Sequence, residues 1–376
     1  MMTISYKNIL FIFSLLLFVA CGESSDEFIP EEEEEEEETR PTNIAEYNAS
    51  DEGLKDYYLP EEYFQIGAAI EPSAITNSYD VKLLKRHINS LTAENVMKWS
   101  TLQATEGNFN YTQADKIVAF AQANGMKVRG HTLCWHNQVP SWVFRDGSQE
   151  ASKELVLERL RTHITNVVTH FKGKVYVWDV VNEAIDDGGS QYKNTDWYRI
   201  CGEDYIFEAF KAARQADPDA KLFYNDYSAT SPNKRDKIYT LLSKLHTQNL
   251  VDGIGMQGHW NIDAPSSNNI TSAFDKYAYL DLEIQITELD VSVYTSDANA
   301  ESEYTSDIAS QQKSAYNRYF SLFRDYKDNI TSITFWGVCD NHTWLDNFPV
   351  NNRKNYPFLF DINYDPKPAY FSVIDF

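Results

Sequence analysis

The segment KVYVWDVVNEA, residues 174–184, holds an apolar, β-branched run that ends abruptly at Asn182 and Glu183. Runs of Val and aromatic residues of this length favour a strand buried on both faces, so the polar pair falls where the strand ends. Burial disfavours a charged carboxylate, which suits a residue that must release a proton near neutral pH. Asn182 can hold a hydroxyl group as a neutral donor and acceptor. Taken alone, Glu183 could instead cap the next helix.

Runs of the same character recur along the chain and alternate with amphipathic, helix-like stretches. Together they make eight candidate strands, at residues 63–69, 87–95, 125–135, 174–183, 220–227, 252–260, 282–291 and 332–340. The helix-like stretches include residues 152–171, 205–216, 234–249 and 311–325. This alternation predicts parallel strands joined by right-handed crossovers, and eight such strands close a barrel. We therefore predict an α/β protein with a single (β/α)8 TIM barrel.

Polar and aromatic residues stand at the carboxyl end of nearly every predicted strand. Active sites of this fold lie at the C-terminal rim, so these side chains are expected to converge on one mouth. They are Glu94, Asn95, His131, Trp135, Asn182, Glu183, Asn225, Asp226, Tyr227, Gln257, His259, Glu288 and Trp336. Any one of them could be purely structural, but the repetition over seven strands favours a functional site.

A second carboxylate, Glu288 in the segment ITELDV at residues 286–291, ends the seventh predicted strand as Glu183 ends the fourth. Two carboxylates on opposite sides of a sugar ring are what cleavage of a glycosidic bond requires. With WDVVNEA and ITELDV, the sequence resembles glycoside hydrolase family 10, the retaining endo-β-1,4-xylanases. The resemblance covers about residues 60–376. It implies hydrolysis of internal β-1,4-xylosidic bonds of xylan or xylo-oligosaccharides by double displacement.

Carried over by position, the resemblance implies that Glu183 is the general acid/base and Glu288 the nucleophile. His259, in the segment GMQGHW, would hydrogen-bond Glu288 and be held by Asp290. That network favours the carboxylate form of Glu288. Asn182 would hold the 2-hydroxyl of the reacting sugar, a contact that strengthens in the transition state.

The resemblance also implies a set of sugar-binding residues. On the glycone side, which holds the sugars before the scissile bond, these are Glu94, Asn95, Lys98, His131 and Gln257, with Trp135, Trp336 and Trp344 as apolar walls. In the family the second tryptophan of the pair Trp336 and Trp344 crowds the hydroxymethyl group of a hexose, so a pentose fits more easily. Asn225 and Tyr227 are expected to line the leaving-group side.

The chain departs from the family pattern at a few positions. Cys339 stands where a small hydroxyl residue is usual, and residues 341–343, Asn-His-Thr, differ from the common lead-in to the second tryptophan. Lys193 stands where an arginine is frequent. We expect none of these to touch a catalytic carboxylate, so they bear on affinity for the sugars and not on the chemistry.

The N-terminus predicts export. Residues 1–20 carry one basic residue, Lys7, before an apolar run that is too short to span a bilayer and is typical of a signal peptide. The residues FVAC before and at Cys21 resemble a bacterial lipobox, which implies a lipid anchor on Cys21. The alternative is ordinary cleavage to a soluble secreted protein. We expect an exported outer-membrane lipoprotein, with surface and periplasmic orientations both open.

Residues 21–55 are predicted to be a disordered tether, because their acidic run, Glu at every position of 31–38, repels itself and offers little apolar surface. Residues 22–50 contribute −11 and the signal peptide +1, so −13 of the net charge of −23 belongs to residues 51–376. An acidic body argues against nucleic acid or an anionic membrane surface as a partner and suits a neutral substrate. The catalytic domain is then residues 56–376, which we expect to be monomeric and to touch a membrane only through the anchor.

The remaining cysteines, Cys134, Cys201 and Cys339, are far apart and odd in number, so we predict three buried free thiols. No histidine falls at metal-ligand spacing, and carboxylate catalysis requires no cofactor, so neither metal nor cofactor is assigned. Two other functions stay open: a β-1,4-glucanase with the same barrel and carboxylates, and a non-catalytic surface protein that captures glycan. Because Asn182, Glu183, His259 and Glu288 are all present, the catalytic interpretation is favoured.

Overall fold

The computed structural model describes residues 52–376. The predicted signal peptide, Cys21 and almost all of the acidic tether lie outside the described residues. Helix α1 (Leu54–Tyr57) starts two residues before the expected domain start at 56, and Leu54 is buried. Within the described part, no helix combines the length and the apolar character that crossing a membrane would need.

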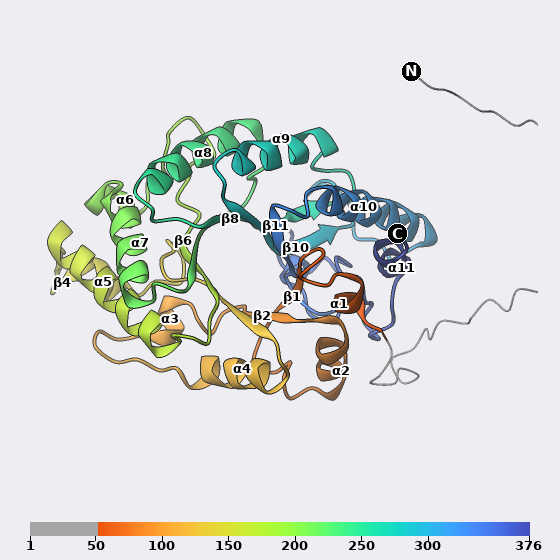
Figure 1. The fold of residues 1–376 in the computed structure, drawn as a ribbon, viewed down its shortest axis with the longest axis horizontal. Coiled ribbons are helices and arrows are strands. Elements are labelled where there is room, and N and C mark those ends of the chain that lie inside the picture. Colours follow the sequence, from red (N-terminus) through yellow and green to blue (C-terminus); the bar gives the residue numbers. More distant parts are fainter. Residues whose placement is uncertain (1–51) are drawn as a thin grey trace, which may run out of the picture. The chain divides into compact units, whose positions relative to one another are not determined.

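Eight parallel strands form the closed barrel at the centre of Figure 1. They are β1 (Gln65–Ile70), β2 (Ser90–Ala93), β3 (Lys127–Gly130), β6 (Val177–Asn182), β7 (Lys221–Asp226), β8 (Gly253–Met256), β10 (Glu283–Ser292) and β11 (Ile330–Phe335). Neighbours in the barrel follow chain order, and β11 pairs with both β10 and β1, which closes the ring. The predicted barrel and its eight strands are confirmed.

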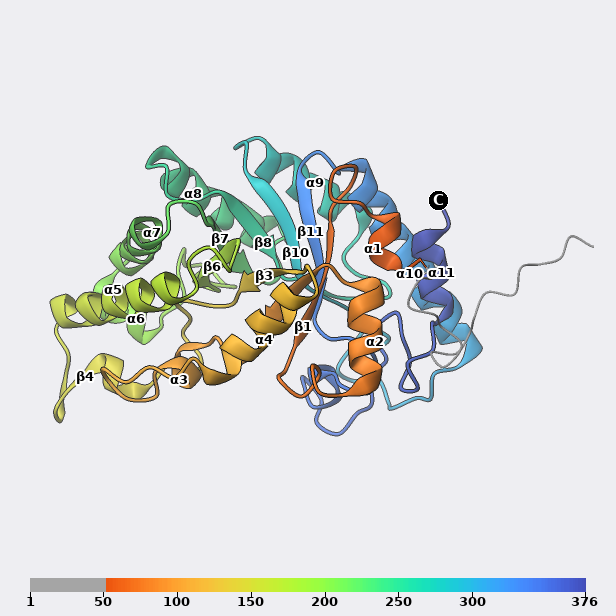
Figure 2. The ribbon, with the colours of Figure 1, turned by 60° about the horizontal axis from the view of Figure 1, so that its bottom comes forward.

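Helices cover the outside of the barrel (Figures 1 and 2). The larger ones are α2 (Ser78–His87), α4 (Thr112–Ala123), α5 (Lys153–His170), α7 (Asp204–Ala216), α8 (Pro232–Thr247), α9 (Ser267–Ala278) and α10 (Ser306–Asp325). Shorter helical segments are α3 (Trp99–Leu102), η2 (Ser141–Phe144), α6 (Asp196–Cys201), η3 (Trp344–Asp346) and α11 (Pro368–Ile374). The four predicted helices are all present. Helix α10 starts five residues earlier than the predicted 311, because Thr305 accepts a hydrogen bond from the amide of Ile308 and caps the helix there.

The strands are buried on both faces, since helices cover them outside and side chains fill the barrel inside. Every residue of β1, β2 and β6 is buried. This is why β1 and β6 are mostly apolar and lack a strict alternation of polar and apolar residues. The close packing leaves no room at Gly130, where an added Cβ would lie 2.2 Å from the ring of Trp178 on the neighbouring strand.

Three additional strands were not predicted. β4 (Arg145–Asp146) and β5 (Gln149–Glu150) form a small exposed hairpin. β9 (His259–Asn261) pairs with the end of β10 and sets His259 opposite Asp290. The prediction that residues 252–260 form one continuous strand is therefore wrong, because the chain leaves the barrel after Met256 and Gly258 adopts a positive φ of 81°.

The three cysteines of the described residues, Cys134, Cys201 and Cys339, are free and buried, as predicted. Burial raises the pKa of the Cys201 thiol to about 11 and also raises the pKa of Cys134 well above its usual value. These thiols are therefore protonated and unreactive near neutral pH.

Candidate active site

The two carboxylates predicted to be catalytic come from β6 and β10, which are separated in the barrel by β7 and β8. Glu183 follows directly after β6, as expected. Glu288 lies inside β10 and not at its end, which corrects the prediction, because β10 continues to Ser292 by pairing with β9. The register between β10 and β11 shifts between Ile286 and Leu289. Glu288 therefore lies at an irregularity of the strand, at the rim of the barrel.

Glu288 is almost fully buried but accepts hydrogen bonds at both carboxylate oxygens. Nδ2 of Asn225 donates to Oε1 at 2.8 Å, and Nε2 of His259 lies 3.1 Å from Oε2. Burial alone would raise the pKa of Glu288, but the hydrogen bond from His259 and the charges of His131 and His259 outweigh it and lower the pKa. Glu288 is therefore held as a carboxylate with its oxygens fixed in place.

His259 connects Glu288 to Asp290. Its Nδ1 lies 2.8 Å from Oδ2 of Asp290, and the indole N–H of Trp344 donates to the same oxygen at 2.8 Å. Burial would lower the pKa of His259, but the charge and hydrogen bond of Asp290, helped by Glu288, raise the pKa to about 10. The ring of Trp344 also meets that of His259 edge to face, with centroids 4.8 Å apart. The predicted chain from Asp290 through His259 to Glu288 is present as hydrogen bonds.

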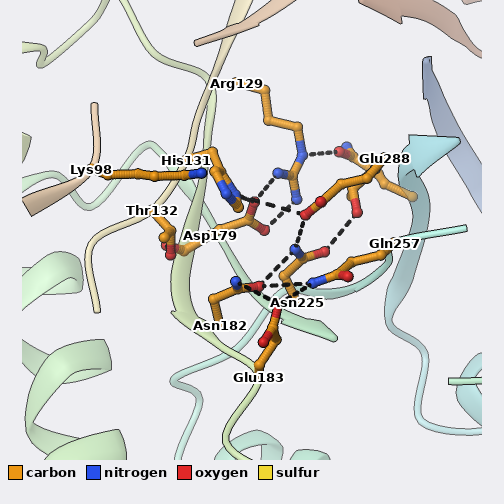
Figure 3. Close-up of polar contacts among 12 residues, drawn as sticks. Lys98, Arg129, His131, Thr132, Asp179, Asn182, Glu183, Asn225, Gln257 and Glu288 are labelled. Atoms are coloured by element: carbon orange, nitrogen blue, oxygen red, sulfur yellow. Dashed lines mark hydrogen bonds and ion pairs between the residues drawn. The ribbon is translucent and has the colours of Figure 1, made fainter. Parts of the chain in front are cut away.

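A group of amide side chains lies between the two carboxylates (Figure 3). Asn225 donates to Glu288 and also to Oδ1 of Asn182 at 2.9 Å. Gln257 donates to Oε1 of Glu183 at 3.0 Å. All three amide side chains, Asn182, Asn225 and Gln257, are buried. The hydrogen bonds that join the two carboxylates are therefore almost completely shielded from solvent.

Asn225 corrects one expectation. We expected it to line the leaving-group side, but it is completely buried, and its amide oxygen accepts from the Thr287 hydroxyl at 2.6 Å. With both ends of its amide occupied, Asn225 orients Glu288 and offers no surface to a leaving group.

Glu183 has a less buried environment than Glu288, with 13 % of its side chain exposed. Its backbone has a positive φ of 58°, an uncommon conformation for a residue other than glycine, and it turns the side chain at the end of β6. Nζ of Lys193 lies 3.6 Å from Oε2 of Glu183. The expectation that Lys193 stays away from the carboxylates is therefore wrong. The side-chain amide of Gln257 and the ammonium group of Lys193 therefore face the two carboxylate oxygens of Glu183, where the proton would be exchanged.

Tyr227 lies beside this lysine, on the Glu183 side of the mouth. Its ring faces the ammonium groups of Lys193, at 4.5 Å, and Lys234, at 3.2 Å, and its hydroxyl donates to Asp187. That Tyr227 lines the leaving-group side stays a prediction.

The residues expected on the glycone side also come together. Lys98 is buried, donates to Oδ1 of Asn95 at 2.9 Å and lies 5.0 Å from the ring centre of Trp135. Burial lowers the pKa of Lys98, and the carboxylates of Glu288 and Glu94 oppose that effect. Together, these side chains present an ammonium group, an amide and an aromatic face to the same region.

His131 and Trp336 adjoin the nucleophile side. Nδ1 of His131 lies 2.9 Å from Oδ2 of Asp179, and the ring of Trp336 meets His131 edge to face at 5.2 Å. Asp179 forms a buried ion pair with Arg129, whose Nε donates to Gln285 at 3.0 Å. The carboxylate of Asp179, which is paired with Arg129 inside the barrel, thus fixes the orientation of the His131 ring.

Several residues of this arrangement were missed at the level of sequence, among them Arg129, Asp179 and Glu71. Asp179 interrupts the apolar run of β6, and Arg129 follows Val128 on β3. Asp179 was a usable signal, because charged residues are rarely buried unless paired. Glu71, which accepts a hydrogen bond from Asn95 at 2.5 Å, follows β1 at the same rim as the others. Among residues 52–376, no group of three or more His, Cys, Asp or Glu side chains has the geometry of a metal site.

Comparison with known proteins gives a consistent result. The family model of glycosyl hydrolase family 10 matches residues 53–376. Endo-1,4-beta-xylanase B of Paenibacillus barcinonensis is 48% identical over 316 residues, which are 83% of this chain and 95% of that protein. An endo-1,4-beta-xylanase of Geobacillus stearothermophilus is 46% identical over 317 residues, with the same two coverages. The crystal structure of a Paenibacillus barcinonensis xylanase with a conduramine derivative aligns with a TM-score of 0.83 at 46% identity, covering 87% of this chain and 99% of that one.

Proposed function

The chain belongs to glycosyl hydrolase family 10, and from that premise we propose that it is an endo-1,4-β-xylanase that cleaves internal bonds of xylan with retention of configuration. The relatives named above carry the same activity in their names and match this chain over nearly their whole length. The observation that carries the proposal is the pair of carboxylates at the barrel mouth, one buried and held ionised, the other joined to it through amide side chains.

In the first step of the proposed mechanism, a carboxylate oxygen of Glu288 attacks the anomeric carbon of the sugar. The bond from that carbon to the leaving-group oxygen breaks, and Glu183 gives its proton to that oxygen. The product is a sugar esterified to Glu288 and a free leaving chain. The contacts of Glu288 with Asn225 and His259 support this role, because they keep the carboxylate charged and aimed before the attack.

In the second step, Glu183, now ionised, takes a proton from water, and the water oxygen attacks the same anomeric carbon. The ester bond to Glu288 breaks, and both carboxyl groups return to their starting forms. Two inversions at one carbon give net retention. Asn182 would hold the 2-hydroxyl of the reacting sugar, which is supported by its position between the two carboxylates.

The substrate surface follows from the same arrangement. Glu94, Asn95, Lys98 and His131 would bind the glycone sugars by hydrogen bonds, with Trp135, Trp336 and Trp344 as flat walls for their C–H faces. Tyr227 would contact the leaving chain, since it lies beside Lys193 and so beside Glu183.

For the whole chain, we propose an exported lipoprotein of the outer membrane, anchored through a lipid on Cys21 and carrying a monomeric enzyme on an acidic tether. The support is the sequence of residues 1–50 alone. The acidic run following the anchor would keep the enzyme away from an anionic membrane surface by repulsion.

The test of the catalytic proposal measures reducing-sugar release by the purified protein from xylan and from carboxymethyl cellulose in parallel. We expect release from xylan and little from the cellulose derivative. Glu288→Ala should lose activity by several orders of magnitude on every substrate, whereas Glu183→Ala should keep activity on an aryl xylobioside with a very acidic leaving group, because such a group departs without protonation.

Glu61→Ala is the matched control, since Glu61 is exposed and far along the chain from both motifs. A Glu288→Ala protein as active as the Glu61→Ala protein would contradict the assignment of the nucleophile. Binding of xylan without any release of sugar would point instead to a protein that only captures glycan.

A further inference from the structure

The backbone that carries Glu183 is held by the neighbouring strand β7 through three consecutive amides. The amide of Glu183 itself donates to the carbonyl of Asn225 at 2.9 Å. The next two amides, those of Ala184 and Ile185, donate at 3.0 and 3.1 Å to one and the same atom, the hydroxyl oxygen of Tyr224. A single side chain thus supports the two residues that follow the proposed acid/base.

These two amides need a side-chain acceptor because the pairing of β6 with β7 ends before them. The ladder stops at the last residue of β6, and the positive φ of Glu183 then turns the chain away. Ala184 and Ile185 are nonetheless buried, so water cannot take the place of the missing partners. A buried amide without an acceptor is costly, and the Tyr224 hydroxyl removes that cost for both residues.

The hydroxyl of Tyr224 uses its full capacity for hydrogen bonds. A phenol has one proton to donate and two lone pairs that accept. The amides of Ala184 and Ile185 take the lone pairs, and the proton is donated to Oδ2 of Asp226. Burial raises the pKa of Tyr224, and the charge of Asp226 raises it further, so the hydroxyl keeps its proton near neutral pH. The three bonds together fix the position of the phenol oxygen.

Asp226 lies behind the barrel mouth and not in it, which corrects the expectation from the sequence. Successive side chains of a strand point to opposite faces, so Tyr224 and Asp226 share the face of β7 that Asn225 does not. Both are completely buried. Nζ of Lys234, a buried residue of α8, lies 2.9 Å from Oδ1 of Asp226 and compensates its charge. Lys234 therefore orients Asp226, and Asp226 orients the Tyr224 hydroxyl.

The same backbone also places the ammonium group that faces Glu183. The carbonyl of Ala184 accepts from the amide of Lys193 at 2.9 Å, and Nζ of Lys193 lies 3.6 Å from Oε2 of Glu183. A shift of Ala184 would therefore move the carboxyl group and its cationic neighbour together.

We propose that Tyr224 is a positioning residue for Glu183, whose carboxyl group it holds at the leaving-group oxygen by accepting from the amides of Ala184 and Ile185. The proposal rests on the proposed function, in which Glu183 is the acid/base. Tyr224 acts through the backbone alone, because its buried side chain offers no surface to a sugar. The loss of its hydroxyl should therefore matter in proportion to the need of the leaving group for a proton.

The test compares Tyr224→Phe with the wild-type protein on aryl xylobiosides that differ only in the leaving group. Dinitrophenol departs without protonation, whereas unsubstituted phenol needs the proton of Glu183. The matched control is Tyr58→Phe, since Tyr58 is equally buried and its hydroxyl donates to the carbonyl of Val373. Tyr58 precedes β1 and so lies at the opposite, amino-terminal end of the barrel.

We expect kcat/KM on the phenyl glycoside to fall by about 100-fold in Tyr224→Phe, because a displacement of about 1 Å at a catalytic group can cost that much. On the dinitrophenyl glycoside kcat/KM should stay near the wild-type value, and Tyr58→Phe should keep both values. Equal losses on the two glycosides in Tyr224→Phe, or no loss on either, would overturn the proposal.

If Tyr224→Phe does not fold, Asp226→Asn decides the question. This variant keeps the size of the side chain but weakens the acceptor of the Tyr224 proton. It should show the same dependence on the leaving group, with a loss of about 5-fold on the phenyl glycoside, the size expected for one weakened hydrogen bond. A loss that is the same for both leaving groups would count against the positioning role.

A failure of the proposed function is distinguishable from a failure of this inference. If the wild-type protein cleaves none of these glycosides, crystal structures of the wild-type protein and Tyr224→Phe still decide where Glu183 lies. A displacement of its carboxyl group by about 1 Å relative to Glu288 supports the positioning role. An unchanged carboxyl group with an unchanged φ at Glu183 refutes it.

Discussion

Asn225 occupies the centre of the active site, because one side chain contacts both the proposed nucleophile and Asn182. In Asn225→Ala, Glu288 loses a donor to its charged form. Hydrogen bonds to charged groups contribute about 1.5–3 kcal/mol, so we expect kcat/KM on xylan to fall by about 10- to 100-fold. The acidic limb of the pH profile should also move to higher pH, because the carboxylate form is less favoured.

The control for Asn225→Ala is Asn233→Ala, whose exposed amide donates only to the carbonyl of Gly188. An Asn225→Ala protein that loses activity with an unshifted pH profile would mean that Asn225 supports the fold of the site and does not tune Glu288.

The pH dependence of stability provides a test of the contact between His259 and its two carboxylates. The pKa of His259 is raised to about 10, whereas an unfolded chain titrates near its ordinary value of about 6.5. Its contribution to the free energy of unfolding is therefore complete below pH 6.5 and is lost as the pH rises towards 10. We expect the difference in unfolding free energy between the wild-type protein and His259→Gln to shrink over this range.

The measurement is urea-induced unfolding at pH 6.5, 8 and 9.5, with His246→Gln, an exposed histidine at the end of α8, as control. Taking the difference between two proteins cancels the titration of all other groups. A difference that stays constant with pH would show that His259 is neutral in the folded protein.

Packing between neighbouring strands depends on Gly130 at the end of β3. An added Cβ would lie 2.2 Å from the indole of Trp178, which is completely buried on β6 and has no space to move into. We expect Gly130→Ala to lower the free energy of unfolding by about 1–3 kcal/mol, as overpacking of a core does. Because His131 follows directly, activity should fall as well.

Denaturant titration checks this expectation against Gly189→Ala, where no atom lies within 4 Å of the added Cβ and the backbone is unstrained. Equal stabilities of the two variants would show that β3 and β6 can separate at no cost.

The short strand β9 positions residues of the active site, as the close packing of β3 against β6 does. Its pairing with the end of β10 brings His259 opposite Asp290, and the same extension of β10 carries Glu288. Residues 293–305 follow this extension outside any helix or strand, and Arg353 holds them, since its Nη1 donates to the carbonyl of Asn299 at 2.9 Å. Secondary structure outside the barrel thus positions the residues that tune the nucleophile.

Anchoring of the whole chain is tested at Cys21. If a lipid is attached there, the exported protein should partition into the detergent phase, and Cys21→Ser should move it to the aqueous phase. Ser24→Ala, three residues away, is the control. Partition of the wild-type protein and Cys21→Ser into the same phase would contradict the anchor and leave a soluble secreted enzyme.

Much of the site was predictable because strand ends are encoded locally. The apolar runs fixed the number of strands, and the polar residue after each run pointed to the rim, as for Glu183 and Gln257. The contacts were less predictable. His259 was expected beside Glu288 only from the family resemblance, and Asn225 was expected elsewhere.

The sequence by itself determined an eight-stranded barrel and the presence of two carboxylates at its mouth, because burial on both faces and the position of a strand end depend on nearby residues. Only the tertiary structure decided which polar groups meet. Asn225 and Glu288 are 63 residues apart in the chain, and Arg129 and Asp179 are 50 apart. Such contacts depend on the register between separate strands, and a shift of one residue would turn each side chain to the other face of its strand.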